Sequence, residues 1–317
     1  MVDDRAGHAV TAAGLTITDL VVEFGGLRAL DLVNLTVAPG SFVGILGPNG
    51  SGKTTLLDAV SGQLRPTSGS VGLDGVDLID YFPEDRAALG LVRSFQDCRL
   101  FPELTVADTL MVAEDARRPV SVLASTLRLP VARRAEEQHA RSVERLLTTF
   151  GLEAFRDRRI DQLSTGTRRV VDLAVIVAAL PRLLLLDEPT SGIAQREAEA
   201  LGPLLKAVHA ETGTTVLLVE HDVPLTVSLC DRLIVMEAGR VVSAGPTAEV
   251  LADPAAIDAY LGASEEALGG EGQVGAGGSA SGAPAPGSVM ATASPTTRAT
   301  SATNVLPAAN TSAAPTR

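Results

Sequence analysis

Cysteine is scarce in this sequence, which excludes a disulfide-stabilised protein and a protein that binds metal through clustered cysteines. Among 317 residues there are two cysteines, Cys98 and Cys230. Two cysteines cannot build a disulfide framework, and these two lack the spacing of metal ligands. We therefore expect two reduced thiols in a cytosolic protein.

Long apolar runs are also missing, although the mean hydropathy is +0.23 and 45% of the residues are hydrophobic. The longest candidate, residues 170–180, contains Asp172 and is shorter than the roughly 18–20 residues of a membrane-spanning helix. Residues 1–10 are acidic and lack the basic-then-apolar order of a signal peptide. We expect a soluble, intracellular protein, or one attached to a membrane through a partner.

Basic residues are outnumbered by acidic ones. Lys and Arg total 26 against 38 Asp and Glu, which gives a formal net charge of −12. Proteins that bind nucleic acid generally present a basic face, because contacts to the phosphate backbone supply much of the affinity. We therefore expect no nucleic-acid partner.

The composition changes near the C-terminal end of the chain. Residues 263–317 are mostly Ala, Gly, Ser, Thr and Pro. Such a segment cannot bury enough apolar surface to offset its chain entropy, so we expect it to be disordered. The sequence thus predicts a flexible N-terminus at 1–13, one domain at 14–262 and a disordered tail at 263–317.

Within the domain, strand-like and helix-like stretches alternate. Apolar runs bounded by turn residues predict buried strands at 41–47, 182–188 and 214–221. A helical pattern follows each run, which is typical of an α/β fold with a mostly parallel sheet covered on both faces.

Between about 95 and 175 the pattern is mostly helical. Residues 133–152 form an amphipathic pattern that predicts a helix ending near Gly151. The sequence therefore predicts a helical subdomain inserted into the α/β core.

A glycine-rich segment at 47–55 follows the first predicted strand and opens a helix that stops at Gly62. It has the G-x-x-x-x-G-K-[ST] pattern of a P-loop, in the strand–loop–helix context that this motif requires. Its glycines let the backbone approach phosphate groups, and the helix N-terminus favours an anion. We expect Lys53 to reach the β- and γ-phosphates and the Thr54 hydroxyl to bind Mg²⁺. The nucleotide-binding candidates are Gly47, Pro48, Asn49, Gly50, Ser51, Gly52, Lys53, Thr54 and Thr55.

Two later strands end in residues that suit nucleotide chemistry. The strand at 182–188 ends in Asp187, which is placed to hold Mg²⁺ through water, and Glu188, which can polarise an attacking water. His221 ends the strand at 214–221, at the carboxyl edge of the sheet where α/β proteins bind ligands. Its position favours contact with the γ-phosphate.

The order of these features resembles the nucleotide-binding domain of ABC transporters. The P-loop is followed by Gln96, by Leu-Ser-Thr-Gly-Thr at 163–167 (the signature), by Leu-Leu-Leu-Leu-Asp-Glu-Pro and Ser-Gly-Ile-Ala between 183 and 194, and by His221. The resemblance covers about residues 14–262 and implies an ABC ATPase fold with an N-terminal antiparallel β part. It also implies Mg²⁺-dependent ATP hydrolysis, with ATP and Mg²⁺ as cofactors.

The resemblance assigns further roles to single residues. Phe24 corresponds to the aromatic residue that stacks on adenine. Gln96 corresponds to the glutamine that senses Mg²⁺ and the attacking water and couples the site to the membrane subunit, and His221 to the switch histidine. The catalytic candidates are therefore Glu188, His221 and Gln96, and the metal candidates are Thr54, Gln96 and Asp187.

The signature departs from the family's usual Leu-Ser-Gly-Gly-Gln. In the family it caps the ATP held by the partner's P-loop, which requires a hydroxyl and free N–H groups at a helix N-terminus. Ser164 is a good N-cap residue, and Gly166 leaves room for close backbone approach. Thr165 and Thr167 replace a glycine and a glutamine, and Ala194 stands where an aspartate is common. We expect a working signature with a weakened contact.

Several stretches are similar to ATP-binding subunits of branched-chain amino acid importers, namely residues 24–31, 92–110, 220–245 and 253–262. This similarity implies transmembrane permease subunits, a second ATP-binding subunit (related or identical) and, indirectly, an extracytoplasmic solute-binding protein as partners. It places the chain peripherally on the cytoplasmic face of the cell membrane. The same subfamily is similar to the ATPase of lipopolysaccharide export, which leaves the solute and the direction of transport open.

Other functions stay open at the level of sequence. A non-hydrolysing, ATP-dependent assembly subunit is favoured by Thr165 and Ala194, whereas Glu188 and His221 favour hydrolysis. A soluble P-loop kinase would need an acceptor site that the sequence does not indicate. A DNA-associated ABC ATPase would show paired ATPase domains or long heptad repeats, but this chain has one P-loop.

Overall fold

The computed structural model describes residues 11–94, 100–117 and 130–259, all within one compact unit, Met1–Gly272. Gln96, Cys98 and the tail at 263–317 lie outside the described residues. Near the N-terminal end, Ala13 is buried, and its backbone N–H donates to the carbonyl oxygen of Arg182 at 3.2 Å. The predicted flexibility of the two ends stays a prediction.

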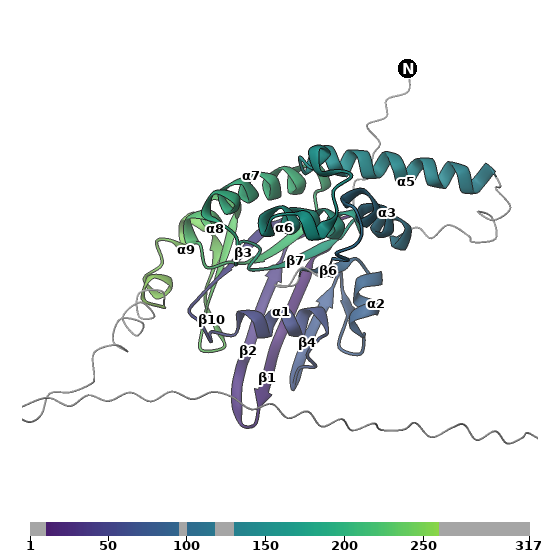
Figure 1. Ribbon diagram of the computed structural model, residues 1–317. Coiled ribbons are helices and arrows are strands. Elements are labelled where there is room, and N and C mark those ends of the chain that lie inside the picture. Colours follow the sequence, from purple (N-terminus) through teal and green to yellow (C-terminus); the bar gives the residue numbers. More distant parts are fainter. Residues whose placement is uncertain (1–10, 95–99, 118–129, 260–317) are drawn as a thin grey trace, which may run out of the picture. The chain divides into compact units, whose positions relative to one another are not determined.

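An antiparallel sheet forms the N-terminal part of the fold (Figure 1). In spatial order its strands are β2 (Leu27–Val37), β1 (Leu15–Phe24), β4 (Ser68–Leu73) and β5 (Val76–Asp77). At the start of β1, buried Leu15 and Ile17 alternate with exposed Thr16 and Thr18, as expected for a sheet with one face in the core. The antiparallel β part implied by the family resemblance is confirmed.

A second, mostly parallel sheet carries the nucleotide-site motifs. In spatial order its strands are β10 (Arg240–Pro246), β9 (Arg232–Glu237), β3 (Phe42–Leu46), β8 (Thr215–Val219), β7 (Leu183–Asp187) and β6 (Leu91–Arg93). Each neighbouring pair is parallel except β9 and β10. Strands β3, β7 and β8 are buried at every position, which explains why their sequences are continuous apolar runs. The three strands predicted from sequence are confirmed.

The helices of the core are α1 (Lys53–Ser61), α2 (Pro83–Ala88), α7 (Gln195–Thr212), α8 (Val223–Leu229) and α9 (Thr247–Val250). Helices α1, α7 and α8 follow the parallel strands β3, β7 and β8. As predicted, α1 begins at the P-loop lysine and ends at Gly62, which adopts the left-handed conformation at the helix end. Among the described residues, none of the helices is both long and apolar enough to cross a membrane.

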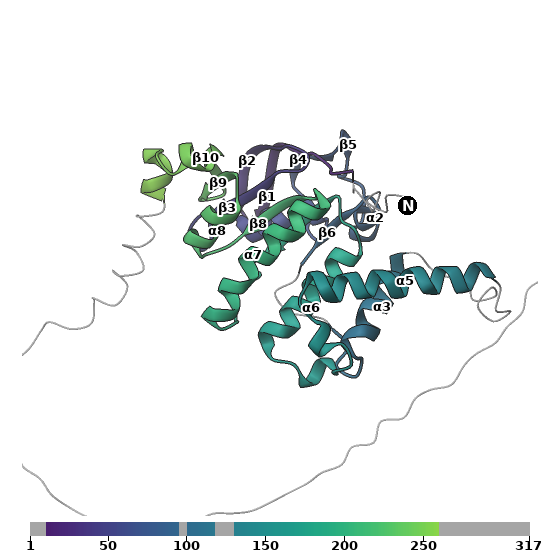
Figure 2. The same cartoon turned by 90° about the horizontal axis from the view of Figure 1, so that it is seen from above.

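Among the described residues, three further helices lie between β6 and β7 in the chain. They are α3 (Val106–Arg117), α5 (Pro130–Thr149) and α6 (Thr165–Ala178), and two short 3-10 helices, η1 (Glu153–Phe155) and η2 (Ile160–Gln162), precede α6. Helix α3 packs on α5 and α6, and Figure 2 shows the three gathered to one side of the strands. The chain leaves α5 through Gly151, at φ +63°, near the predicted helix end. The inserted helical part is therefore confirmed, whereas its exact limits stay a prediction.

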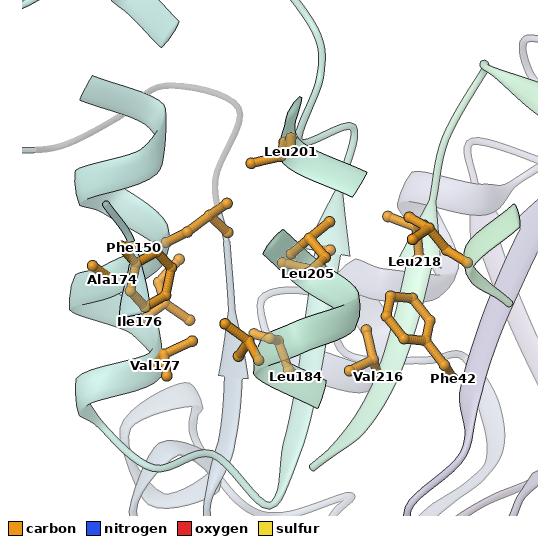
Figure 3. Packing of buried hydrophobic residues seen from close by; sticks show 14 of the residues in the cluster. Phe42, Phe150, Ala174, Ile176, Val177, Leu184, Leu201, Leu205, Val216 and Leu218 are labelled. Carbon is orange, nitrogen blue, oxygen red and sulfur yellow. The ribbon is translucent and has the colours of Figure 1, made fainter. Parts of the chain in front are cut away.

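Two apolar clusters lie on opposite faces of the parallel sheet. Strand β3 shows this division, because Phe42 and Leu46 belong to the first cluster and Val43 and Ile45 to the second. Figure 3 shows the first cluster, with the labelled side chains Phe42, Phe150, Ala174, Ile176, Val177, Leu184, Leu201, Leu205, Val216 and Leu218. Cys230 lies in this cluster as a free thiol, and burial raises its pKa to about 12.

A buried arginine from α2 anchors the C-terminal end of α1. Arg86 is 2% exposed, and its guanidinium donates hydrogen bonds to the carbonyl oxygens of Ala59 at 2.8 Å and Val60 at 2.7 Å. It also donates to the carbonyl oxygen of Leu78 at 2.6 Å. The last carbonyl groups of a helix lack partners within the helix, and a cation there complements the helix dipole. The end of the P-loop helix that lies away from the phosphate site is therefore fixed in place.

We expect Arg86→Met to lower the free energy of unfolding by about 1–3 kcal/mol, because it removes the buried guanidinium that donates to three carbonyl groups. The matched control is Arg65→Met, since the Arg65 side chain is 75% exposed and pairs with an equally exposed Asp80. Exposed pairs of this kind contribute about 0–1 kcal/mol. Urea unfolding followed by circular dichroism measures both. Equal losses in the two variants would contradict the anchoring role.

Candidate nucleotide-binding site

The P-loop joins β3 to α1 and packs closely on neighbouring backbone. Gly52 has φ +101°, a left-handed conformation that favours glycine, and a Cβ there would lie 2.7 Å from the carbonyl oxygen of Ala29. At Gly47 a Cβ would collide with the carbonyl oxygen of Met236. These two positions require glycine because the loop is pressed against other strands. The first N–H groups of α1 have no partner within the helix, which suits a bound phosphate.

Lys53 is buried at the start of α1, and its ammonium group folds back onto the P-loop. Its Nζ donates to the carbonyl oxygens of Gly47 at 2.7 Å and Pro48 at 2.9 Å. Burial lowers the pKa of Lys53, and the carboxylates of Glu188 and Asp187 oppose this shift. A buried ammonium with neutral carbonyl partners fits a site that receives phosphate anions.

Two buried oxygen atoms near the P-loop have no hydrogen-bond partner within the part of the chain that the structure describes. They are Ser51 Oγ and Asp187 Oδ1, and Asp187 is 2% exposed at the end of β7. Hard oxygen ligands of this kind suit Mg²⁺ or its bound water. Among the described residues there is no group of three His, Cys, Asp or Glu side chains that could hold a metal ion. The buried Asp187 carboxylate, together with hydroxyl and phosphate oxygens, fits the oxygen ligands that Mg²⁺ prefers.

Glu188 and His221 face each other beyond the ends of β7 and β8. His221 Nε2 lies 2.7 Å from Glu188 Oε1, although the two residues are 33 positions apart in the chain. The Glu188 backbone has φ +47°, a sparsely populated conformation for a residue with a side chain. Its N–H donates to the carbonyl oxygen of Val219 on β8 at 2.9 Å. The fold thus brings together two catalytic candidates that the sequence identified separately.

Two buried charged residues hold the loop that carries Glu188. Arg169, on α6, donates to the carbonyl oxygens of Pro189 at 2.9 Å and Glu188 at 3.1 Å. Glu220 accepts hydrogen bonds from the N–H of Thr190 at 2.9 Å and from its hydroxyl at 2.6 Å. The unusual backbone conformation at Glu188 is therefore fixed from both sides of the loop.

Sequence reasoning missed Arg169, Glu220 and a third charged residue, Arg93. Arg93 ends β6, and its guanidinium lies 2.8 Å from Asp187 Oδ2. Each has a signal in the sequence, because each is a charged residue beside a buried strand or within a mostly apolar helix. That signal shows only that a charge lies next to apolar residues in the chain, and the folded structure shows that it is buried and which groups it contacts.

The signature lies at the start of α6. Ser164 is the N-cap residue, as predicted, and its Oγ accepts the N–H of Thr167 at 3.1 Å. The Thr167 hydroxyl oxygen lies 2.9 Å from Ser164 Oγ. Thr165 is the first helical residue, so its backbone is right-handed and needs no glycine. The two threonines therefore leave the start of the helix intact.

A carboxylate from the same chain occupies the space beside Gly166. Glu197, on α7, accepts a hydrogen bond from Ser164 Oγ at 3.1 Å, and a side chain at Gly166 would collide with its carboxylate. A negative charge is favourable at this helix N-terminus. An approaching phosphate would need to displace Glu197. Ala194, the N-cap residue of α7, supplies no capping side chain.

The remaining candidates are placed as follows. Phe24 ends β1 with half of its surface exposed, and Thr54 is exposed in the first turn of α1. Asn49 and Gly50 are exposed at the tip of the P-loop. The individual roles of these residues stay predictions, as do those of Gln96, which lies outside the described residues.

Asp172 lies on α6 beside Arg169, with 4.0 Å between Asp172 Oδ2 and Arg169 Nη1. Burial raises the pKa of Asp172 from 3.8 to about 6, and Arg169 partly opposes this shift. Because the folded state then binds more protons than the unfolded state over this range, stability is lost as the pH rises from about 4 to about 6.

We expect Asp172→Asn to raise the free energy of unfolding at pH 7.5, by at most about 3 kcal/mol given the size of the pKa shift. It should also flatten the dependence of stability on pH between about 4 and 6. Urea unfolding at a series of pH values measures this, with the exposed Asp157→Asn as the matched control. An Asp172→Asn curve parallel to that of the unaltered protein would contradict the assignment.

Comparison with known proteins agrees with this geometry. Residues 30–191 match the ABC transporter family model. The high-affinity branched-chain amino acid transport ATP-binding protein BraF of Pseudomonas aeruginosa is 35% identical over 248 residues, which are 78% of this chain and 97% of BraF.

Two solved structures are similar to the fold described here. MJ1267, an ATP-binding cassette of an ABC transporter solved in its ADP conformation, has a TM-score of 0.66 at 30% identity, over 80% of this chain and 100% of that one. The dimeric cassette MJ0796 in a post-hydrolysis state with ADP and Pi has a TM-score of 0.62 at 26% identity, over 74% of this chain and 98% of that one. The chain therefore belongs to the ABC transporter family, as an ATP-binding and ATP-hydrolysing subunit.

Proposed function

We propose that this subunit uses ATP hydrolysis to power the uptake of branched-chain or related amino acids. The observation that supports the chemistry is the convergence of Lys53, Asp187 and the Glu188–His221 pair at one edge of the parallel sheet. The solute class is supported by the identity to BraF, whose own name assigns it to branched-chain amino acid transport. Permease subunits would form the path through the membrane, and this chain would sit peripherally on its cytoplasmic face.

ATP would bind between the antiparallel sheet and the P-loop. Phe24 offers an exposed aromatic face for the adenine ring. The P-loop N–H groups would surround the β- and γ-phosphates, and Lys53 would exchange its two carbonyl partners for phosphate oxygens. This exchange replaces neutral partners of a buried cation with charged ones, which favours binding.

Glu188 would polarise the water that attacks the γ-phosphate, and His221 would orient that carboxylate and contact the phosphate. Thr54, Asp187 and Gln96 would hold Mg²⁺. When bound, Mg²⁺ neutralises the charge that develops on the phosphates. The backbone contacts of Arg169 and Glu220 would keep Glu188 in position before the nucleotide arrives.

A second ATPase subunit, identical or related, would complete the site. The signature of each subunit would face the nucleotide held by the other, so that Ser164 and Gly166 contact the γ-phosphate once Glu197 moves away. The dimeric MJ0796 cassette supports this arrangement by similarity of fold. A solute-binding protein outside the cell would deliver the amino acid to the permeases.

We expect Glu188→Gln to lower the steady ATPase rate of the assembled complex by about 100-fold or more, because it removes a general base. ATP should not bind more weakly, since Glu188 polarises water and its negative charge does not hold the phosphates. Phosphate release and binding of a fluorescent ATP analogue measure the two quantities. Glu249→Gln, at an exposed position on α9, is the matched control. An unchanged rate in Glu188→Gln would overturn the assigned role.

Helix α3 and the residues before it offer a surface for the permease. Phe101, Met111 and Val112 expose large apolar side chains there, and exposed apolar groups of this size are common at protein interfaces. Helix α3 begins shortly after Gln96 in the sequence, and Gln96 is the residue assigned by resemblance to couple the site to the membrane subunit.

We expect Val112→Asp to reduce the amount of this subunit that purifies with its permeases from solubilised membranes, because it places a charge in the apolar contact. The ATPase rate of the isolated subunit should not change. Val76→Asp, on exposed β5 of the antiparallel sheet, is the matched control. Equal recovery of both variants with the permeases would place the docking surface elsewhere.

A further inference from the structure

Arg93 is buried between the P-loop helix α1 and the end of β7, which carries Asp187. It is the last residue of β6, and its side chain is 7% exposed. One guanidinium nitrogen, Nη2, lies 2.8 Å from Asp187 Oδ2. The other, Nη1, lies 2.5 Å from Asp58 Oδ1 and 3.2 Å from Ser61 Oγ. One side chain therefore joins the end of β7 to the P-loop helix.

The two oxygen atoms of Asp187 have different surroundings. Oδ2 is paired with Arg93, whereas Oδ1 is buried without a hydrogen-bond partner among the residues that the structure describes. The backbone of Asp187 is also held, because its N–H donates to Ser94 Oγ at 3.1 Å. Two consecutive residues at the end of β6 thus fix both the main chain and the side chain of Asp187, and they leave one carboxylate oxygen free.

The contact between Arg93 and Asp58 holds the P-loop helix α1, which forms the other side of the proposed Mg²⁺ site. Asp58 and Thr54 are four residues apart on α1, so they lie one above the other on the same face of the helix. By binding Asp58 and Asp187 together, Arg93 fixes the P-loop helix relative to β7. Thr54 and Asp187 are the two described residues to which Mg²⁺ binding is assigned above.

We propose that Arg93 is a positioning residue for the Mg²⁺ site: its fork holds Asp187 Oδ2 and Asp58, and it presents Asp187 Oδ1 to the metal. This inference rests on the proposed Mg²⁺ site. A planar guanidinium binds two carboxylates in a fixed geometry, which a lysine ammonium does not reproduce. Without Arg93, the buried Asp187 carboxylate would lose its hydrogen-bonded cation and would be free to rotate.

The positive charge of Arg93 has the opposite direct effect on a metal ion. A cation hydrogen-bonded to the other oxygen of the same carboxylate repels Mg²⁺, so its removal would strengthen metal binding if charge alone mattered. Loss of orientation weakens binding, because groups that orient metal ligands typically contribute about 10- to 100-fold to metal affinity. A lower metal affinity after removal of Arg93 would therefore indicate positioning, whereas a higher affinity would indicate simple charge repulsion.

The test compares Arg93→Met, Arg93→Lys, Asp58→Asn and Asp187→Asn in the full chain. Mn²⁺ replaces Mg²⁺, and its affinity in the presence of a non-hydrolysable ATP analogue is measured by electron paramagnetic resonance. The affinity for the same analogue is also measured in EDTA, and thermal unfolding checks that each variant folds. We expect Arg93→Met to weaken Mn²⁺ binding by about tenfold or more, with unchanged analogue affinity in EDTA. Arg93→Lys and Asp58→Asn, which each keep a charge beside Asp187, should weaken it less.

Four results would overturn the inference. Unchanged or tighter Mn²⁺ binding in Arg93→Met would exclude positioning. An equal loss of analogue affinity in EDTA would show that Arg93 supports the P-loop as a whole. If Asp187→Asn also leaves Mn²⁺ affinity unchanged, the proposed Mg²⁺ site itself fails, and the inference fails with it. If Arg93→Met does not fold, Arg93→Lys and Asp58→Asn decide, and normal Mn²⁺ affinity in both would exclude positioning.

Discussion

The nucleotide site depends on the register of three short parallel strands that are buried on both faces. Strand β8 pairs with β3 on one side and with β7 on the other, residue by residue. This pairing brings the start of the P-loop, the Asp187–Glu188 pair and His221 to one edge of the sheet. A slip of one residue would turn each strand's side chains to the opposite cluster, so packing on both faces fixes the register.

Buried charge is the second constraint on this edge of the sheet, and it is met by pairing. Asp187 is paired with Arg93, the Glu188 loop is held by Arg169 and Glu220, and Lys53 binds P-loop carbonyl groups. Uncompensated charges in these positions would be costly. The site is therefore preorganised before a nucleotide binds. Ser51 Oγ and Asp187 Oδ1, two buried oxygen atoms without a hydrogen-bond partner among the described residues, belong to the segments where phosphate and metal are proposed to bind.

Helix α6 connects the signature to the catalytic loop of the same subunit. Its first residues follow the Ser164 cap, and one turn further Arg169 binds the carbonyl oxygens of Glu188 and Pro189. Glu197 on α7 accepts a hydrogen bond from Ser164 Oγ, so α7 is also connected to the signature. A displacement of α6 would therefore move the signature and also change the contacts that hold the Glu188 backbone. This arrangement offers a physical route between the helical part, where permeases are proposed to bind, and the reaction.

The sequence alone determined the features that depend on local pattern. Continuous apolar runs predicted β3, β7 and β8, and the P-loop pattern predicted where α1 begins and ends, because strand burial and helix capping follow from neighbouring residues. Only the tertiary structure decided how distant residues meet. It paired Glu188 with His221, assigned Arg93 to Asp187, and showed that Thr165 lies in a right-handed helical turn. A sequence shows that Arg93, Arg169 and Glu220 are charged, but their partners lie on other elements. The physical reason is that the charge of a residue belongs to the residue itself, whereas the groups that pair with it in a buried site are brought close only by folding.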